Sequence, residues 1–185
     1  MFNEQDLNLI FRALNFAADK HRNQRRKGRE MPPYINHLIH VANLLWDVGS
    51  VRDVPTLTAA ILHDTLEDTN TTEAELQAQF GAEVLSLVQE VTDDKSLPKA
   101  TRKQLQIEHA LHISPKAKLI KLADKIDNVT DVTHDPPADW PHARLVAYLD
   151  WSEQVVAGLR GANAGLEARY DAVLREARHI LNKRP

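Results

Sequence analysis

The segment "VPTLTAAILHDTLEDT", residues 54–69, has the spacing of a single helix in which one face changes from apolar to acidic. At about 100° per residue, an arc of roughly 140° holds four ionisable residues: His63, Asp64, Glu67 and Asp68. Earlier turns of the same arc are apolar (Leu57, Ala60 and Ile61). A solvated helix face normally stays polar throughout, and buried carboxylates need partners or a metal ion. The segment therefore indicates a partly buried polar pocket, with a solvated acidic helix end as the alternative.

The rest of the chain repeats apolar residues at helical spacing and has almost no alternating strand pattern. Two apolar stripes mark early helices: Leu7, Ile10, Phe11, Leu14 and Ala18, and then Val41, Leu44, Leu45 and Val48. Helix starts are predicted at Thr72, with capping-box spacing to Glu75, and at Ser114 before Pro115. Further helices are expected over residues 139–159 and from about residue 164 to 181. We therefore predict one compact all-α domain over residues 1–185, with about eight or nine helices.

The composition is ordinary for a globular protein, with 43% hydrophobic and 26% charged residues. A formal net charge of −3 provides no basic field for nucleic acid. The absence of cysteine excludes disulfides, thiolate metal sites and cysteine nucleophiles, and it fits a reducing cytosol. The N-terminal residues lack a signal-peptide pattern, and no apolar run is long enough for a membrane span. We expect a cytoplasmic protein without a membrane partner.

Two further candidates for the pocket lie on other predicted helices. His37 lies in "PYINHLIHVANLL", where His40, one turn later, competes with it by spacing. Asp124 lies in "AKLIKLADKIDN" and again follows an apolar stretch. Each has a plainer interpretation, which is a core or surface histidine for His37 and an ion pair with Lys121 or Arg102 for Asp124.

Two imidazoles and two carboxylates form a mixed nitrogen and oxygen donor set that suits Mn²⁺, Fe²⁺ or Zn²⁺. Closed structural zinc sites usually contain thiolates, which this chain lacks, so an open catalytic site is favoured. A metal ion in an open site lowers the pKa of a bound water towards about 7. Glu67 and Asp68, one turn beyond His63 and Asp64, are candidates for orienting or deprotonating that water.

A basic cluster occupies "HRNQRRKGRE", residues 21–30. It predicts either a solvated helix end, where cations complement the helix dipole, or a clamp for phosphates or a nucleotide. A basic patch beside an acidic metal site is typical of a phosphate-ester hydrolase.

Taken together, "RRKG", "PPYINHLIHVANLL", "AAILHDTLEDT", "VTDDKSLPK" and "AKLIKLADKIDN" resemble the HD-superfamily hydrolase domain of RelA/SpoT-type proteins. The likeness is greatest to the metazoan-type stand-alone small alarmone hydrolases and spans about residues 10–160. It implies an all-α fold of the HD-superfamily hydrolase type, a Mn²⁺ ion (Zn²⁺ or Fe²⁺ as alternatives) and a small-molecule nucleotide substrate. The implied reaction releases the 3′-diphosphate of ppGpp or pppGpp as pyrophosphate and leaves GDP or GTP.

The resemblance also implies roles for single residues. Four would ligate the metal ion: His37, His63, Asp64 and Asp124. The resemblance thus favours His37 over His40 as a ligand. Glu67 and Asp68 match the paired acids that position the attacking water. Five residues match substrate-binding positions: Arg26, Lys27, Asn128, Arg144 and Tyr148.

The chain departs from the family pattern after "LADK". The family commonly continues with an aromatic residue or His and then Asn-x-Arg, whereas this chain has Asp127, Asn128 and, in place of Arg, Thr130. With Asp127 and Asp131 in this segment, we expect a more acidic pocket wall that holds a highly charged substrate less tightly. A second, alarmone-synthesising domain is not expected in 185 residues.

Other functions fit parts of this pattern. The same site would serve an NADPH 2′-phosphatase or another HD-type nucleotide phosphohydrolase. The Glu67/Asp68 pair argues against a regulator that binds nucleotides without catalysis, and the net charge argues against a nucleic-acid-binding module. No partner-protein motif is evident, and the sequence leaves the oligomeric state open. Trp140 and Trp151 are interpreted as ordinary helix residues without a role in the site.

Overall fold

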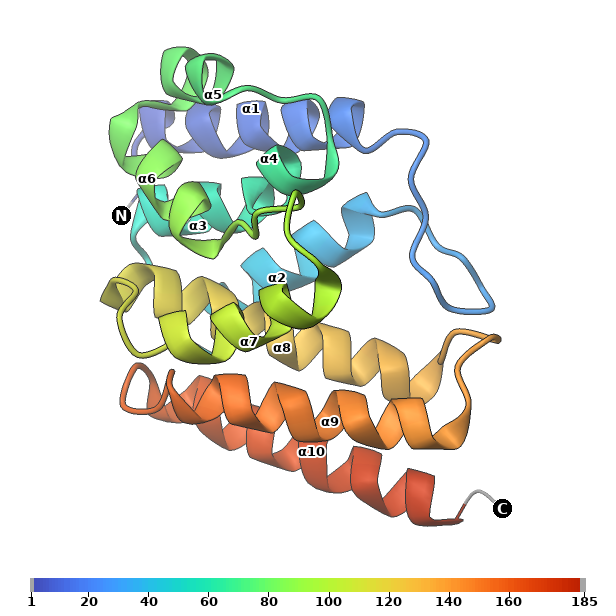
Figure 1. Ribbon diagram of the computed structural model, residues 1–185. Coiled ribbons are helices and arrows are strands. Elements are labelled where there is room, and N and C mark those ends of the chain that lie inside the picture. Colours follow the sequence, from blue (N-terminus) through green and yellow to red (C-terminus); the bar gives the residue numbers. More distant parts are fainter. Residues whose placement is uncertain (1, 184–185) are drawn as a thin grey trace.

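The computed structural model describes residues 2–183, which form ten helices and no extended strand beyond one isolated bridge (Figure 1). The helices are α1 (Glu4–Lys20), α2 (Ile35–Asp47), α3 (Val54–Leu62), α4 (Thr65–Asp68), α5 (Glu73–Phe80), α6 (Ala82–Val91), α7 (Lys99–His109), α8 (Pro115–His134), α9 (His142–Ala157) and α10 (Ala164–Lys183). The all-α prediction is confirmed. Among these residues, no helix combines the length and apolar character that a membrane crossing requires.

α8 is the central helix of the fold. It packs against α2, α3, α6, α9 and α10, and in Figure 1 it runs across the middle of the molecule. Its start is as predicted, because the Ser114 hydroxyl accepts the Ala117 N–H at 3.2 Å and Pro115 is the first helical residue. Since α8 is surrounded by other helices, Asp124 and Asp127 are buried together with its apolar residues. Buried carboxylates require partners, and those partners define the site described below.

The prediction of one helix over residues 54–69 is wrong. The chain instead makes α3, a turn at His63 and Asp64, and the short helix α4. In an uninterrupted helix, the carbonyls of this turn would accept hydrogen bonds from backbone amides. Here two side chains bind to such carbonyls instead. The His63 Nδ1 atom lies 2.7 Å from the Ala60 carbonyl oxygen, and the Thr65 hydroxyl donates to the Leu62 carbonyl at 2.6 Å. The extra break, together with the other connections, raises the number of described helices above the expected eight or nine.

The apolar stripe predicted on α1 is partly wrong. Ala13 and Ala17 are fully buried, whereas Leu7 and Phe11 are 43% and 60% exposed. α1 packs on α3 through a face that carries these two alanines, whose small side chains permit a close approach. Periodicity favoured the larger apolar residues and so placed the buried face incorrectly.

Helix ends were predicted more accurately than buried faces. The last helix begins at Ala164 as expected. The Thr72 hydroxyl accepts the Glu75 N–H at 3.2 Å, but the Glu75 carboxylate pairs with Lys20 at 2.8 Å, so the capping box is only half formed. α8 extends to His134.

The assignment of the core can be tested with one chemical change at two positions. Leu166 on α10 is fully buried and Leu111 is 63% exposed. We expect Leu166→Ala to lower the free energy of unfolding by about 2–5 kcal/mol, because it leaves a cavity. Leu111→Ala should change it by less than about 0.5 kcal/mol. Urea denaturation followed by circular dichroism measures both, and equal losses would contradict the assignment.

Candidate metal centre and active site

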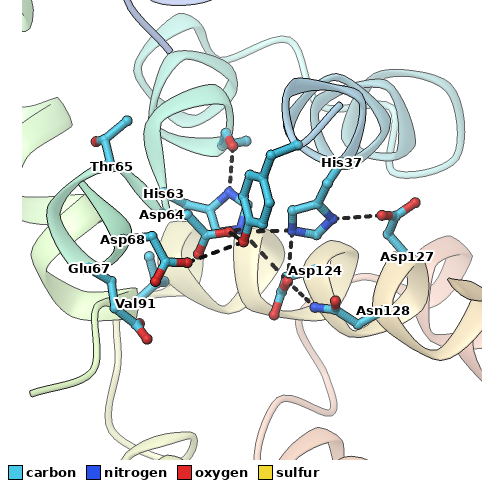
Figure 2. A network of polar contacts seen from close by, with 12 residues as sticks. His37, His63, Asp64, Thr65, Glu67, Asp68, Val91, Asp124, Asp127 and Asn128 are labelled. Carbon is cyan, nitrogen blue, oxygen red and sulfur yellow. Dashed lines mark hydrogen bonds and ion pairs between the residues drawn. The ribbon is translucent and has the colours of Figure 1, made fainter. Parts of the chain in front are cut away.

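Four ionisable side chains from three segments converge beside α8 (Figure 2). His37 comes from α2, His63 and Asp64 from the turn after α3, and Asp124 from α8. The His37 Nε2 atom lies 3.6 Å from Asp64 Oδ2 and 3.3 Å from Asp124 Oδ1. The His63 Nε2 atom lies 3.3 Å and 3.7 Å from the same two oxygens. The four predicted metal ligands are therefore brought together.

The two imidazoles present their Nε2 atoms to a common space. Both Nε2 atoms are buried and have no hydrogen-bond partner among the described residues. The Nδ1 atoms are engaged elsewhere, by Asp127 Oδ2 at 2.6 Å for His37 and by the Ala60 carbonyl at 2.7 Å for His63. A neutral imidazole that donates from Nδ1 has its lone pair on Nε2. Two such lone pairs facing two carboxylate oxygens fit a divalent cation.

His40, the competing histidine, is not part of this cluster. Its side chain is 61% exposed, and its Nδ1 atom contacts Asp127 Oδ1 at 3.3 Å. His37, His63 and Asp124 each offer a ligand atom, and these three atoms lie within 4.8 Å of one another. The burial of His37 thus separates two histidines that sequence spacing left equivalent.

Charges within the cluster shift its protonation equilibria. Burial alone would lower the pKa of His37, but its contacts with Asp124 and Asp127 raise it to about 9. Burial alone would raise the pKa of Asp124, but Lys125 and the two imidazoles hold it well below its usual range. The same imidazoles lower the pKa of Asp64. A cation that binds here must therefore compete with a proton on His37.

Tyr34 supports the cluster and was not identified from the sequence. Its hydroxyl donates to Asp64 Oδ2 at 2.6 Å and lies 3.3 Å from Asp68 Oδ2. Burial and the neighbouring Asp64 raise the pKa of Tyr34, so the hydroxyl remains a donor. The available signal was its position three residues before His37, at the start of α2.

The two predicted catalytic acids differ in their surroundings. Glu67 Oε2 accepts the Asp93 N–H at 3.0 Å, and Glu67 Oε1 lies 3.7 Å from Arg102 Nη1. Burial raises the pKa of Glu67 to about 6. Asp68 instead contacts the Lys95 ammonium group and the Tyr34 hydroxyl. Figure 2 shows Glu67 apart from the ligand cluster, and both acids line the same cavity as His63, Asp64 and Asp124.

This cavity has a volume of about 410 Å³ and a strongly cationic wall. The cations that line it are Lys27, Lys95, Lys99, Arg102, Lys103, Lys121, Lys125 and Arg144. Among them, the sequence analysis assigned a substrate role only to Lys27 and Arg144, and it named Lys121 and Arg102 only as possible ion-pair partners of Asp124. Lys99, Arg102 and Lys103 occupy one face of α7 at helical spacing, which is the signal that was missed. Such a wall suits a substrate with several phosphates.

An adjoining cavity of about 430 Å³ contains Arg26, Lys27, Asn128 and Tyr148 in its lining. Arg26 donates to Asp131 Oδ2 at 2.8 Å and to Asn128 Oδ1 at 2.7 Å. The Asn128 amide in turn donates to Asp124 Oδ1. The two cavities share Lys27, Asn128 and Tyr148, so the predicted substrate residues line one continuous region beside the ligand cluster.

The acidic wall expected from the departure after "LADK" is formed only in part. Asp131 lines the adjoining cavity but is paired with Arg26. Asp127 lines neither cavity, because it is buried against His37. Burial therefore removes Asp127 from the surface that a substrate would meet, and the contact with Arg26 offsets the charge of Asp131.

The basic cluster at residues 21–30 contributes only in part. Arg25, Arg26 and Lys27 line the adjoining cavity, whereas Arg22 pairs with Asp19 at the surface. The clamp therefore stays a prediction, and it concerns the three consecutive cations that line the cavity.

Two tryptophans without an expected role also line the main cavity. Trp140 and Trp151 lie on either side of Tyr148, with ring centroids at 5.6 and 5.4 Å from it. Lys103 and Lys125 lie 4.5 and 4.6 Å from the centroid of the Trp151 ring. The Trp151 ring therefore holds both ammonium groups beside the cavity in a cation–π arrangement.

The chain is similar to known proteins in sequence and in fold. Residues 13–148 match the HD domain family. The chain is 52% identical over 166 residues to the guanosine-3′,5′-bis(diphosphate) 3′-pyrophosphohydrolase MESH1 of Xenopus tropicalis, covering 90% of this chain and 93% of that protein. It is 52% identical over 158 residues to the Homo sapiens protein of the same name, covering 85% and 88%. A solved structure of a metazoan ortholog of SpoT, described as hydrolysing ppGpp, superposes with a TM-score of 0.90 at 44% identity and 95% and 97% coverage.

The loop that carries Arg26 and Lys27 is fastened to the end of α8 by Asp135. Its carboxylate accepts the Arg29 N–H at 2.7 Å and the Glu30 N–H at 3.2 Å. A Cβ atom at Gly28 would lie only 1.8 Å from Asp135 Oδ2. Glycine therefore allows the close approach on which this attachment depends.

Gly28→Ala should detach this loop without unfolding the protein. We expect hydrogen exchange of the Arg29 and Glu30 amides to accelerate about tenfold or more, since each hydrogen bond contributes about 1 kcal/mol. Asp135→Asn, which weakens the acceptor without adding a side chain, is the matched comparison. Exchange is measured by NMR, with the amides of α10 as an internal reference. Unchanged exchange in Gly28→Ala would contradict the close contact.

Proposed function

The chain belongs to the HD domain family, and from this premise we propose that it is a metal-dependent hydrolase of ppGpp and pppGpp. It releases the 3′-diphosphate as pyrophosphate and leaves GDP or GTP. The observation that carries the proposal is the pair of buried, unpartnered Nε2 atoms facing two carboxylates beside a cationic cavity. Relatives named as guanosine-3′,5′-bis(diphosphate) 3′-pyrophosphohydrolases, alike over most of their length, support this substrate.

The proposed metal centre uses His37, His63, Asp64 and Asp124. Two imidazole nitrogens with carboxylate oxygens suit Mn²⁺, which is the ion we propose, and the same donors accept Zn²⁺ or Fe²⁺. When bound, the ion supplies Lewis-acid stabilisation of phosphoryl charge and a lowered pKa for a water molecule. Tyr34 holds Asp64 in place through its hydroxyl, 2.6 Å from Asp64 Oδ2.

The cationic wall binds the phosphates of the substrate. Lys27 and Arg144 lie in the lining of the main cavity, as do the cations of α7. In our proposal Arg26 contacts the nucleotide from the adjoining cavity, Asn128 lies against the sugar, and Tyr148 faces the phosphates. Fixed cations also stabilise the charge that develops on the phosphoryl oxygens during reaction.

The proposed step is an in-line displacement at the phosphorus atom bound to the ribose 3′-oxygen. Glu67 accepts a proton from the attacking water, whose oxygen forms the new bond to phosphorus. The bond between phosphorus and the 3′-oxygen breaks, the 3′-oxygen takes up a proton from solvent water, and pyrophosphate leaves. Glu67 then returns its proton to solvent. Asp68, held by Lys95 and Tyr34, orients the water. A pKa of about 6 leaves Glu67 ionised at neutral pH and still basic enough to accept the proton.

The alternatives are less well supported. The names of the similar proteins refer to guanosine bis(diphosphate), which does not favour an NADPH 2′-phosphatase. Glu67 and Asp68 both line the cavity beside the ligand cluster, an arrangement that a non-catalytic nucleotide-binding regulator would not need.

The decisive assay is incubation of chelator-treated protein with ppGpp, with and without added Mn²⁺, with the products separated by anion exchange. We expect GDP and pyrophosphate in equal amounts, and only when the metal is present. Intact ppGpp in the presence of protein with bound metal would contradict the substrate assignment. NADPH, with released phosphate as the readout, is the comparison substrate.

Two variants separate the roles of ligand and base. Asp64→Ala should lose both metal binding and turnover, because it removes a carboxylate from the centre. Glu67→Gln should keep its metal ion and lose about 10²–10⁴-fold in kcat, the usual contribution of a general base. Metal content by atomic emission and initial rates measure both effects. Loss of metal from both variants, or an unchanged rate in Glu67→Gln, would overturn these assignments.

The proposed base also predicts a pH dependence. Because burial raises the pKa of Glu67 to about 6, its basic form increases as the pH rises through that value. We expect kcat/KM, at saturating Mn²⁺, to fall about tenfold per pH unit below 6 and to level off above it. This decrease of kcat/KM below pH 6 should be absent from Glu67→Gln. The same decrease in that variant would assign the titration to another group.

A further inference from the structure

Asp127 is a buried carboxylate that the proposed reaction does not use. It lies on α8, one turn after Asp124, and it is 7% exposed. Its Oδ2 atom is 2.6 Å from His37 Nδ1, and its Oδ1 atom is 3.3 Å from His40 Nδ1. Figure 2 shows Asp127 on the side of the His37 ring opposite the ligand cluster. The imidazole of His37 thus lies between the cluster and a second carboxylate.

The distances show which neighbour is the main hydrogen-bond partner of Asp127. The nearest Arg26 nitrogen is 4.0 Å away, beyond hydrogen-bonding range, and Arg26 bonds instead to Asp131 and Asn128. His40 is largely exposed, so water competes for its contact. The hydrogen bond with His37 is the shortest of these contacts, and both of its partners are buried. Asp127 is therefore primarily an acceptor for His37.

An acceptor in this place restricts the imidazole in two ways. It keeps the proton on Nδ1, so that Nε2 carries the lone pair, and it opposes a flip of the ring, which would leave a buried N–H without a partner. A carboxylate acceptor also makes the opposite nitrogen a stronger donor to a metal ion. His63 has only the neutral Ala60 carbonyl in the equivalent place. The two histidines are thus held by acceptors of different charge.

We infer that Asp127 is a positioning residue of the metal centre, which fixes the tautomer and orientation of His37 and strengthens it as a ligand. The inference rests on the metal centre of the proposed function. It assigns to Asp127 an effect on metal affinity rather than on the chemical step. It also places the effect on His37 and not on His63.

The test compares Asp127→Asn with Asp131→Asn, the same change one turn further along α8. Asp131 binds Arg26 at 2.8 Å, and no contact joins it to His37. Mn²⁺ is titrated into chelator-treated protein by calorimetry, without nucleotide. Asp127→Asn should weaken binding about 10–100-fold, the usual effect of losing such an acceptor, while Asp131→Asn binds like the wild type. Equal affinity of Asp127→Asn and wild type would overturn the inference.

A spectroscopic readout separates positioning from a general loss of structure. In ¹⁵N-histidine-labelled wild-type protein loaded with diamagnetic Zn²⁺, we expect a protected Nδ1–H proton on His37. Asp127→Ala should lose this signal and keep the corresponding signal of His63. Absence of the His37 signal from wild-type protein would also overturn the inference, even if the variants failed to fold.

These outcomes are distinguishable from failure of the proposed function. A wild-type protein that binds Mn²⁺, shows the His37 signal and leaves ppGpp intact would refute the substrate and support Asp127. Hydrolysis of ppGpp together with unchanged affinity in Asp127→Asn would support the substrate and refute Asp127.

Discussion

The burial of charged side chains on α8 is the constraint on which the site depends. This helix is surrounded by five others, so the carboxylates of Asp124 and Asp127 cannot be solvated as surface groups are. Both instead lie against the single imidazole of His37, Asp124 at 3.3 Å from Nε2 and Asp127 at 2.6 Å from Nδ1. A buried charge without a partner costs several kcal/mol, roughly the margin by which a domain of this size is stable. The fold must therefore bring α2 and the α3–α4 turn to this point, and the same demand assembles the candidate metal centre.

The metal cluster alone would repel the substrate proposed for it. Glu67, Asp68 and Asp93 lie in the cavity lining together with the ligand carboxylates, and a nucleotide with several phosphates adds more negative charge. The cations of α7 offset this repulsion. None of the residues of α7 is fully buried, and the helix is attached partly through Arg102 beside Glu67 and Trp151 bonded to the Lys103 carbonyl. An element held by few buried apolar contacts belongs to the less stable part of a fold. The wall proposed to bind the phosphates is thus also the part best able to adjust to them.

The sequence predicted the cluster better than the wall, for a physical reason. An acid or histidine that follows an apolar stripe on a helix is conspicuous, and this pattern identified His63, Asp64 and Asp124 even though the predicted helix breaks at the turn. His37 and His40 could not be separated by spacing, because only tertiary packing buries one and exposes the other. Lysines and arginines on α7 look like any solvated helix face until α9 packs against it. The α1 stripe failed similarly, since two alanines face the core where larger residues were expected.

The residues after "LADK" show that the effect of a local change of charge depends on where the fold places each side chain. The sequence has Thr130 where the family commonly has Arg, with Asp127 and Asp131 nearby. This pattern predicted an acidic wall that binds phosphates less tightly. Helical geometry separates these residues instead. Thr130 turns its hydroxyl to the Ile126 carbonyl of its own helix, Asp131 binds Arg26, and Asp127 lies beneath His37. Because residues three apart share a helix face, an acid at 127 lies on the face of Asp124, where the neighbouring imidazole has a proton to donate. Asp127 therefore acts on His37 from the side away from the cavities, whereas Arg26 offsets the charge of Asp131 in the lining of the adjoining cavity.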